Sequence, residues 1–530
     1  MRIIALLAAA SLILCAKPRK PAPQFQTSDR CLACHNGLTT SSGEDISIGF
    51  NWRASMMANS SRDPYWQASV RRESLDHPES QAAIEDECSA CHMPMARFES
   101  KRGGGEGTVF SHIPFGSGKV EDQQAEDGVS CSLCHQISKL KLGTRESFNG
   151  GFAIEPPDAN GERAEYGPFK VEKGHTRIMR SSSGGFRPSE SEHIRQSEVC
   201  ATCHTLYTKA LGAGGKVIGE LPEQMPYQEW LHSEFREKQS CQSCHMPVVK
   251  EEVRITNVLG EMREGMSRHV FVAANTFMLR MLNRYRNELS VVALSGELAL
   301  AAERTERFLQ TQTARIAIEG MEVRAGRLEA EVAVENLGGH KLPTGYPSRR
   351  AWLHVVVRDR NQQVVFESGR LKPDGAIEGH DGDADPARFE PHYDEITRGD
   401  QVQTYESVMA DQNGAVTTGL LDAVRYVKDN RLLPRGFDKR TAGKDIAVVG
   451  EAERDADFTG AGDKVRYTVA LGNSQGPYRM EAELCYQAIS HRWANNLKKY
   501  DAPEPRRFTG YYDSMASDSA VVLVRAVSER

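Results

Sequence analysis

Cysteine and histidine occur together in five copies of one pattern, Cys-x-x-Cys-His, which takes up ten of the twelve cysteines. The copies are Cys31, Cys34 and His35; Cys88, Cys91 and His92; Cys131, Cys134 and His135; Cys200, Cys203 and His204; and Cys241, Cys244 and His245. This spacing lets two thiols form thioethers to the vinyl groups of one haem, while the adjacent imidazole binds the iron. Chance predicts roughly 0.01 such motifs in a chain of this composition. The pattern therefore predicts five covalently attached c-type haems.

Disulfides and zinc sites are the two alternatives for paired cysteines. A set of disulfides gives no reason for a histidine after every pair. A zinc site needs two closely spaced Cys-x-x-Cys pairs, and the histidine after each pair is optional there. Haem attachment explains every position of the motif, so we favour it.

The second axial ligand of each haem decides what that haem can do. Two protein ligands give low-spin iron suited to electron transfer, whereas one ligand leaves the iron open to a substrate. Eleven of the sixteen histidines lie outside the motifs. Our candidates for the distal ligands are His112, His175, His193, His232 and His269, with His77 and His340 in reserve. Met56 and Met57 are rival ligands for the first haem, although a methionine is more often a core residue.

The periodicity of the 530-residue chain predicts a multidomain protein. Residues 31–275 should form a loop-rich, mainly α cytochrome domain in which haems replace a conventional core, with helices near Asp63–Arg72 and Pro226–Phe235. Residues 276–312 have helical spacing and predict a helical connector. Residues 313–530 contain alternating apolar stretches that predict a C-terminal antiparallel β-sandwich, in which Cys485 is a buried thiol.

The N-terminus predicts export. Residues 1–15 resemble a secretory signal peptide, because a short positive start is followed by an apolar run too short to span a bilayer. Cys15 stands where bacterial lipoproteins carry their lipidated cysteine, although Leu14 departs from the small residue that usually precedes it. Residues 16–30 should be an extended tether. We expect a lipid-anchored protein in the periplasm or at the outer membrane and cell surface; the alternative is an exported soluble protein cut nearby.

Composition excludes some partners and leaves one metal hypothesis open. The formal charge of −6 and the absence of a basic tract argue against nucleic acid. Asp381, Asp383 and Asp385 alternate as in a calcium loop, because hard cations prefer oxygen ligands. The closing Glu of that loop is missing, so a solvated acidic loop is the favoured interpretation.

The region from Cys31 to Asn275 resembles the multihaem, here pentahaem, c-type cytochromes of bacterial respiratory and extracellular electron-transfer chains. It is also similar to the tetrahaem cytochromes of ammonia oxidisers, which have packed haem pairs. The stretches that carry the resemblance are Asp127–Ile137, Ser197–Tyr207 and Cys241–Pro247. The resemblance implies close haem stacking, bis-histidine ligation, and other multihaem cytochromes or redox proteins as partners.

Three classes of function are compatible with the sequence. Electron transfer is favoured, because candidate distal histidines outnumber the motifs. The alternative is a reductase of a small nitrogen or sulfur oxyanion with one open haem. Pentahaem nitrite reductases usually end one motif in Lys, whereas all five motifs here end in His. The third class, a haem-bearing adhesion or scaffold protein, is supported by the β domain alone. Binding of carbon monoxide by the reduced protein separates the first two classes.

Overall fold

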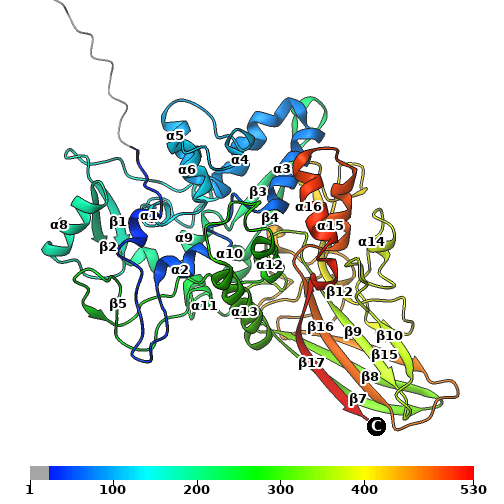
Figure 1. Cartoon of the computed structure of the whole chain (residues 1–530). Helices are drawn as coiled ribbons and strands as arrows, with labels where there is room; N and C mark the ends of the chain where they lie inside the picture. Colours follow the sequence, from blue (N-terminus) through cyan, green and yellow to red (C-terminus); the bar gives the residue numbers. More distant parts are fainter. Residues whose placement is uncertain (1–22) are drawn as a thin grey trace, which may run out of the picture.

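The structure, a computed structural model, describes residues 23–530 and divides into a loop-rich first region and an elongated β-sandwich (Figure 1). The expected signal peptide, Cys15 and residues 16–22 of the expected tether lie outside the described residues. Pro23 to Arg30 do not extend away from the body. Phe25 is buried, and the side-chain amide of Gln24 donates a hydrogen bond to Gln136 at 2.8 Å. The chain is therefore anchored to the first region from residue 24 onward.

The first region contains short helices and three two-stranded sheets. Its helices are α1 (Asp29–Leu32), α2 (Ile48–Arg53), α3 (Pro64–Asp76), α4 (Gln81–His92), α5 (Pro94–Arg102), α6 (Val120–Glu126), α7 (Cys131–Cys134), α8 (Lys173–Ser182), α9 (Ser197–Ala201), α10 (Pro226–Leu231) and α11 (Cys241–His245). Its strands are β1 (Arg163–Gly167), β2 (Phe186–Glu190), β3 (Leu206–Leu211), β4 (Val217–Gln224), β5 (Val253–Arg254) and β6 (Met262–Arg263). The region is mixed rather than mainly α, because the segments between motifs pair as β1–β2, β3–β4 and β5–β6.

Local sequence explains why the helices form where the motifs lie. Cysteines three positions apart fall on the same face of a helical turn, so a single turn presents both thiols together. Helices α4, α7 and α11 each contain both cysteines of a motif. The longest of the early helices, α3, begins with Pro64 after Asp63, whose carboxylate accepts hydrogen bonds from the backbone N–H groups of Tyr65 and Trp66.

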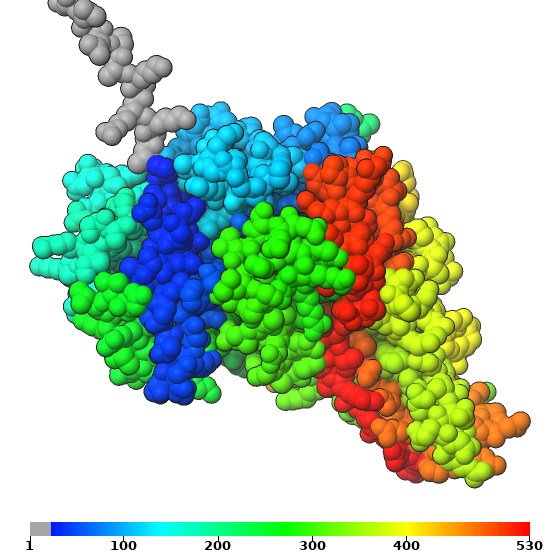
Figure 2. Space-filling model, in the orientation of Figure 1, coloured from blue at the N-terminus to red at the C-terminus, as the bar shows by residue number. Residues whose placement is uncertain are grey.

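The expected connector is a pair of helices, α12 (Thr276–Arg284) and α13 (Ser295–Gln312), with a non-helical link between them. Phe277 and Leu282 of α12 are buried in a cluster that also contains Leu298 of α13. In Figure 2 this green segment lies between the blue and cyan surface of the first region and the red surface that follows residue 490. The helical spacing thus predicts the type of this element, and tertiary packing divides it.

Two sheets form the sandwich. One has the order β13-β12-β9-β16-β17, with β10 on β9 and β14 on β12; the other has the order β11-β15-β8-β7. The strands and the short helix between them are β7 (Ala314–Arg324), β8 (Arg327–Asn336), β9 (Arg350–Arg358), β10 (Val364–Ser368), α14 (Asp381–Ala384), β11 (Glu395–Ile396), β12 (Thr404–Ala410), β13 (Val416–Thr417), β14 (Arg425–Asp429), β15 (Asp463–Ala470), β16 (Arg479–Gln487) and β17 (Ala520–Glu529). Their pairing is antiparallel except for β11 with β15. Alternate residues such as Val332 of β8 and Val355 of β9 fill the core between the sheets, and Cys485 is buried in β16.

Two helices inserted between β16 and β17 join the halves of the molecule. They are α15 (His491–Asn496) and α16 (Pro503–Asp513), and α16 packs on α3 of the first region. The ring centres of Tyr65 and Phe508 lie 5.0 Å apart, and Arg71 pairs with Glu504 at 2.8 Å. Among residues 23–530, no helix combines the length and hydropathy that a membrane span requires.

Candidate haem cavity

All fifteen motif residues line one connected cavity of about 1130 Å³. Its walls come from the first region, from α12 and α13, and from the segment between β8 and β9. The volume exceeds the roughly 300–1,000 Å³ of a site for one small ligand. The fold therefore brings together five motifs that are spread over more than two hundred residues, and leaves space beside them for more than one group.

Six histidines at this cavity share one hydrogen-bond pattern. In each, Nδ1 faces a backbone carbonyl oxygen, at distances from 2.5 to 3.0 Å. The six are His35, His92, His135, His245, His269 and His340, and their carbonyl partners belong to Ile255, Ser60, Tyr166, Val272, Ser267 and Lys341. An Nδ1–H that donates to a carbonyl fixes the tautomer and leaves Nε2 as a lone-pair donor, as in protein metal sites.

Burial keeps the imidazoles of the five motifs and of His269 neutral. It lowers the pKa of His92 and of His204 to about 4, and that of His269 to about 3. The pKa values of His35, His135 and His245 are also lowered, again chiefly by burial. A neutral imidazole is the form that binds a metal, so these side chains are in the ligand-competent state at neutral pH.

Two pairs of imidazoles face each other across the cavity. The ring centres of His135 and His269 are 6.3 Å apart with 20° between the planes, and those of His245 and His340 are 6.2 Å apart with 8° between the planes. Two collinear metal–nitrogen bonds of about 2 Å place the ring centres of trans imidazoles roughly 6 Å apart. Each pair therefore fits one iron between its rings, and the thiols of the same motif lie beside it, so the residues present fit a covalently held haem.

Four of the seven distal candidates do not line the cavity. Their ring nitrogens face other groups. His112 uses both nitrogens, on Asp122 and Thr108. His193 uses both, on Ser191 and the carbonyl of Ile137. For the remaining two, Nε2 of His232 contacts the carbonyl of Asp438, and Nε2 of His77 lies 3.2 Å from the carboxylate of Asp422 without forming a hydrogen bond.

His175 lies at the cavity wall with a different arrangement. Its Nε2 hydrogen-bonds to the carbonyl of Leu259 at 2.8 Å, so it has no free Nε2 like that of the six other histidines. The loop that ends at Leu259 also holds His35 through the carbonyl of Ile255. His175 is thus connected to the first motif through this loop. Met56 and Met57 also line the cavity, but each packs in a hydrophobic cluster.

Contacts between thiols give the neighbours of each motif. A hydrogen bond to Cys131 lowers the pKa of Cys31, and the same interaction raises that of Cys131. Equivalent thiol pairs join Cys91 with Cys203 and Cys200 with Cys241. The first motif therefore adjoins the third, and the fourth adjoins both the second and the fifth. Cys134 also lies close enough to Cys203 for the charge of Cys203 to raise its pKa, after burial.

His92 and His204 have no histidine opposite them in the described chain. The ring of Trp66 lies parallel to His92 at 4.3 Å. Tyr65, Tyr346, Arg349 and Tyr486 form a polar wall of the same cavity, and Arg349 is the member whose charge reaches His204. Burial, then the nearby charges of His245 and Arg349, lower the pKa of His204.

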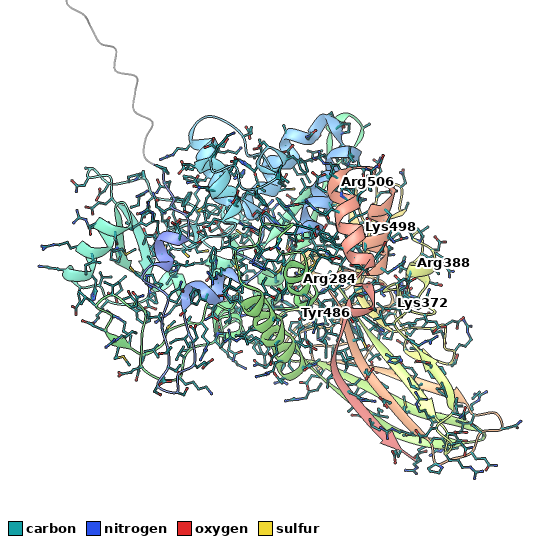
Figure 3. All side chains as sticks on the ribbon, viewed as in Figure 1. Arg284, Lys372, Arg388, Tyr486, Lys498 and Arg506 are labelled. Carbon is teal, nitrogen blue, oxygen red and sulfur yellow. The ribbon has the colours of Figure 1, made fainter. Side chains whose placement is uncertain are left out.

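The polar wall near His204 contains buried groups without partners. The hydroxyls of Tyr65 and Tyr486 have no hydrogen-bond partner, and Figure 3 labels Tyr486 at the end of β16 that adjoins the first region. Burial raises the pKa of Asp63 to about 6, against the opposing effect of hydrogen bonds and the Arg349 charge. Unsatisfied buried hydroxyls are costly unless something fills the space beside them. Sequence reasoning missed this wall; the available signal was the polar, Gly- and Pro-containing segment that also carries His340.

A buried charge network holds His340 in place. Glu229 of α10 is fully buried and accepts hydrogen bonds from the backbone N–H of Lys341 at 3.1 Å and from Thr344 at 2.5 Å. It also pairs with Arg431 at 2.9 Å, while the Lys341 ammonium pairs with Asp429 at 2.8 Å. The residue next to His340 is therefore fixed to the first region and to β14 at once.

The acidic loop that contains Asp381, Asp383 and Asp385 does not bring its three carboxylates together. Asp383 is buried and paired with Arg350, Asp381 pairs with Arg388, and Asp385 accepts a hydrogen bond from the backbone N–H of Ala387. Because two of the three carboxylates are neutralised by arginines, the arrangement does not favour the calcium loop that the sequence left as the less favoured alternative. The solvated-loop interpretation also fails for Asp383, which lies in the core.

The comparisons with known proteins agree with this geometry at the level of the fold. No protein-family model and no curated protein matches the chain. A solved structure, the penta-heme cytochrome c552 from Thermochromatium tepidum, matches with 14% identity and a TM-score of 0.54. The match covers 96% of this chain and 99% of that chain, so it includes the sandwich as well as the first region. The chain thus has a multihaem-cytochrome-like fold.

Proposed function

We propose that this protein is a c-type cytochrome that transfers electrons through five covalently attached haems. The observation that carries the proposal is the single cavity lined by five complete motifs, with the Nε2 atoms of six imidazoles left free. Haem, when bound, supplies a one-electron centre whose potential depends on its axial ligands and surroundings. The chain holds six of the cavity imidazoles by backbone carbonyls.

The distal ligands that we propose are fewer than the sequence suggests. His269 would serve the motif of His135, and His340 the motif of His245, because their rings are already opposed. His175 is the candidate for the motif of His35, which shares a loop with it. A small movement of α8 would free its Nε2 from Leu259. Low-spin, bis-histidine centres are therefore proposed at three of the five motifs.

The thiol contacts support a branched route for electrons. The first and third motifs form one neighbouring pair, and the fourth motif lies between the second and the fifth. Cys134 and Cys203 connect the two groups. We propose that the fourth motif is the branch point, so that its loss would interrupt more of the route than the loss of the first.

Export and partners are proposed from the sequence. Covalent haem attachment takes place outside the cytoplasm, and the first fifteen residues resemble a lipoprotein signal. The proposed location is the periplasm or the outer membrane and cell surface, with Cys15 as the lipid anchor. Redox proteins, including other multihaem cytochromes, are the proposed partners.

The test is the mass and the carbon monoxide spectrum of the purified protein. We expect five haem additions by intact mass. His269→Ala and His340→Ala should each add one carbon monoxide-binding haem to the number in the parent. His112→Ala is the matched control and should add none, because His112 is occupied by Asp122 and Thr108. Fewer than five additions, or equal spectra for all three variants, would overturn the proposal.

A second function, reduction of a small oxyanion, is favoured by the polar wall near His204. No histidine opposes His204 in the described chain, and the wall offers the guanidinium of Arg349 with the unpartnered hydroxyls of Tyr65 and Tyr486. Arginine and hydroxyl donors suit an anion such as nitrite. We infer that an open iron at this motif, fed by its neighbours, would make the protein an oxidoreductase.

This second function has its own test. The reduced parent should bind carbon monoxide, and nitrite or hydroxylamine should change its spectrum. Arg349→Gln should weaken the nitrite-induced change while carbon monoxide binding persists. Arg315→Gln, at an exposed position of β7, is the control. A reduced parent that binds no carbon monoxide refutes the open site and leaves electron transfer as the function.

A further inference from the structure

A cluster of carboxylates lies in the sandwich, outside the haem cavity. One carboxylate oxygen each from Asp455, Asp457 and Asp463 lie within 4.8 Å of one another, and Asp394 and His392 lie equally close to Asp455. Three separate stretches of chain supply these residues: the segment before β11, the loop after residue 453, and the first residue of β15. None of the sequence motifs pointed to this cluster.

Asp463 distinguishes this cluster from an ordinary acidic surface. It is 2% exposed, and its Oδ2 accepts hydrogen bonds from Tyr405 at 2.6 Å and Gln403 at 3.1 Å. Its Oδ1 is buried and has no hydrogen-bond partner. That oxygen lies 3.9 Å from Nε2 of His392, the same nitrogen that contacts Asp455. A buried carboxylate oxygen therefore points toward the cluster with nothing to satisfy it.

The hydrogen-bond network shows that His392 is not a free ligand. The side-chain oxygen of Gln403 accepts from the backbone N–H of Tyr393, and that of Asn430 accepts from the backbone N–H of Glu406. Their NH₂ groups therefore face His392 and donate to its Nδ1, at 2.9 and 3.1 Å. Nδ1 is an acceptor, so Nε2 carries the proton and donates to Asp455 at 2.9 Å. His392 positions Asp455, and the ligands that remain are oxygens.

The negative charge of the cluster is not balanced by the chain. Within residues 23–530, no lysine or arginine pairs with the carboxylates of Asp394, Asp455, Asp457 or Asp463. Lys439 approaches the loop but donates to the carbonyl oxygens of Ala452 and Asp455. Burial, then the charge of Asp455, raises the pKa of Asp457, and burial raises that of Asp463 to about 6. Burial is the largest cause of both shifts, and a bound cation would oppose it by favouring the charged carboxylates.

We propose that Asp455, Asp457 and Asp463, with Asp394 at the rim, bind one Ca²⁺ ion. Calcium takes six to eight oxygen ligands at flexible geometry, which suits carboxylates from three loops with water completing the shell. An all-oxygen set with no free imidazole or thiol disfavours zinc. The ion would fasten the segment before β11 and the loop at 455–457 to the start of β15, at a site separate from the haem motifs.

The experiment is calcium titration of the chelator-treated holoprotein by calorimetry, with thermal unfolding followed in parallel. We expect one calcium-dependent site assigned to this cluster and a higher midpoint with Ca²⁺ than with EDTA. Asp457→Asn should weaken calcium binding about tenfold or more; Asp457 is exposed, so the variant should fold. Asp385→Asn, in the other acidic loop, is the matched control and should bind like the parent.

Three results would overturn the proposal. One is the absence of calcium binding at millimolar Ca²⁺. Another is a calcium affinity that Asp457→Asn leaves unchanged, which would mean that any bound ion lies elsewhere, for instance on haem propionates. The last is binding of Zn²⁺ alone, which would mean that His392 changes its tautomer. Asp463→Asn provides a second variant. Its calcium affinity reports loss of the ion, and its thermal unfolding midpoint in EDTA reports any folding defect that is independent of the ion.

Discussion

Removing the charge of Glu229 should destabilise the junction between the first region and the sandwich. Glu229 is fully buried, pairs with Arg431, and accepts hydrogen bonds from Lys341 and Thr344. Glu229→Ala leaves those donors without an acceptor and leaves Arg431 with Asp429 as its remaining partner. Breaking a buried ion pair by removing one partner costs about 3–5 kcal/mol. We expect a loss of that size in the free energy of unfolding.

The measurement is urea unfolding of the holoprotein, followed by the circular dichroism of the strands. Glu237→Ala is the matched control, since Glu237 lies in the same segment, carries the same charge and is exposed. Exposed positions change stability by about 0.5 kcal/mol or less. If Glu229→Ala costs no more than Glu237→Ala, the buried network does not hold the junction, and the reasoning is refuted.

The same variant has a spectroscopic consequence. Lys341 follows His340, so loosening the backbone at Lys341 should let His340 move away from His245. We expect additional carbon monoxide binding in Glu229→Ala, and none in Glu237→Ala. A destabilised variant with an unchanged spectrum would mean that His340 is held by its own loop rather than by Glu229.

Three further predictions concern pH, attachment and anchoring. Burial raises the pKa of Glu390 from 4.5 to about 7, so the folded chain keeps a proton that the unfolded chain releases, and stability falls as the pH rises through this window. Glu390→Gln should remove that part of the fall, about 2 kcal/mol, in unfolding measured at pH 5 and pH 7.5. Cys200→Ala should lose or loosen one haem and leave the other four attached, as measured by the number of haem additions in the intact mass. Cys15→Ser should move the protein out of the membrane fraction; retention there would exclude lipid at Cys15 as the anchor.

Local patterns predicted the elements whose signal lies within one segment. The alternation at 328–334 indicates a strand, and β8 covers it; the helical spacing after residue 275 indicates α12 and α13. The motifs predicted which cysteines and histidines line the cavity. The strand pairs in the first region were missed, because β3 and β4 are held by each other and by the surrounding fold rather than by strong alternation.

The distal side was predicted only in part, because it depends on which distant segments meet. His269 was a candidate and lies opposite His135, whereas His340 was only in reserve. His193 and His232 lie close to motifs in sequence, but backbone carbonyls and hydroxyls take their ring nitrogens. His340 is almost a hundred residues beyond the last motif, and only the docking of the sandwich brings it opposite His245. Arg349 and the carboxylate cluster at Asp463 could not be predicted for the same reason, because their neighbours come from separate segments of the chain.

The parts of the chain that form the cavity walls imply an order for haem attachment and folding. The first motif adjoins the third, and the last wall, with His340, belongs to the C-terminal half. A chain that crosses a membrane N-terminus first presents all five motifs before the segment that encloses them has emerged. Contacts over such long sequence separations also form slowly. If haem is attached outside the cytoplasm as we propose, the enzymes that attach it would therefore meet exposed thiols on an open chain, and closure by the sandwich would complete maturation afterwards.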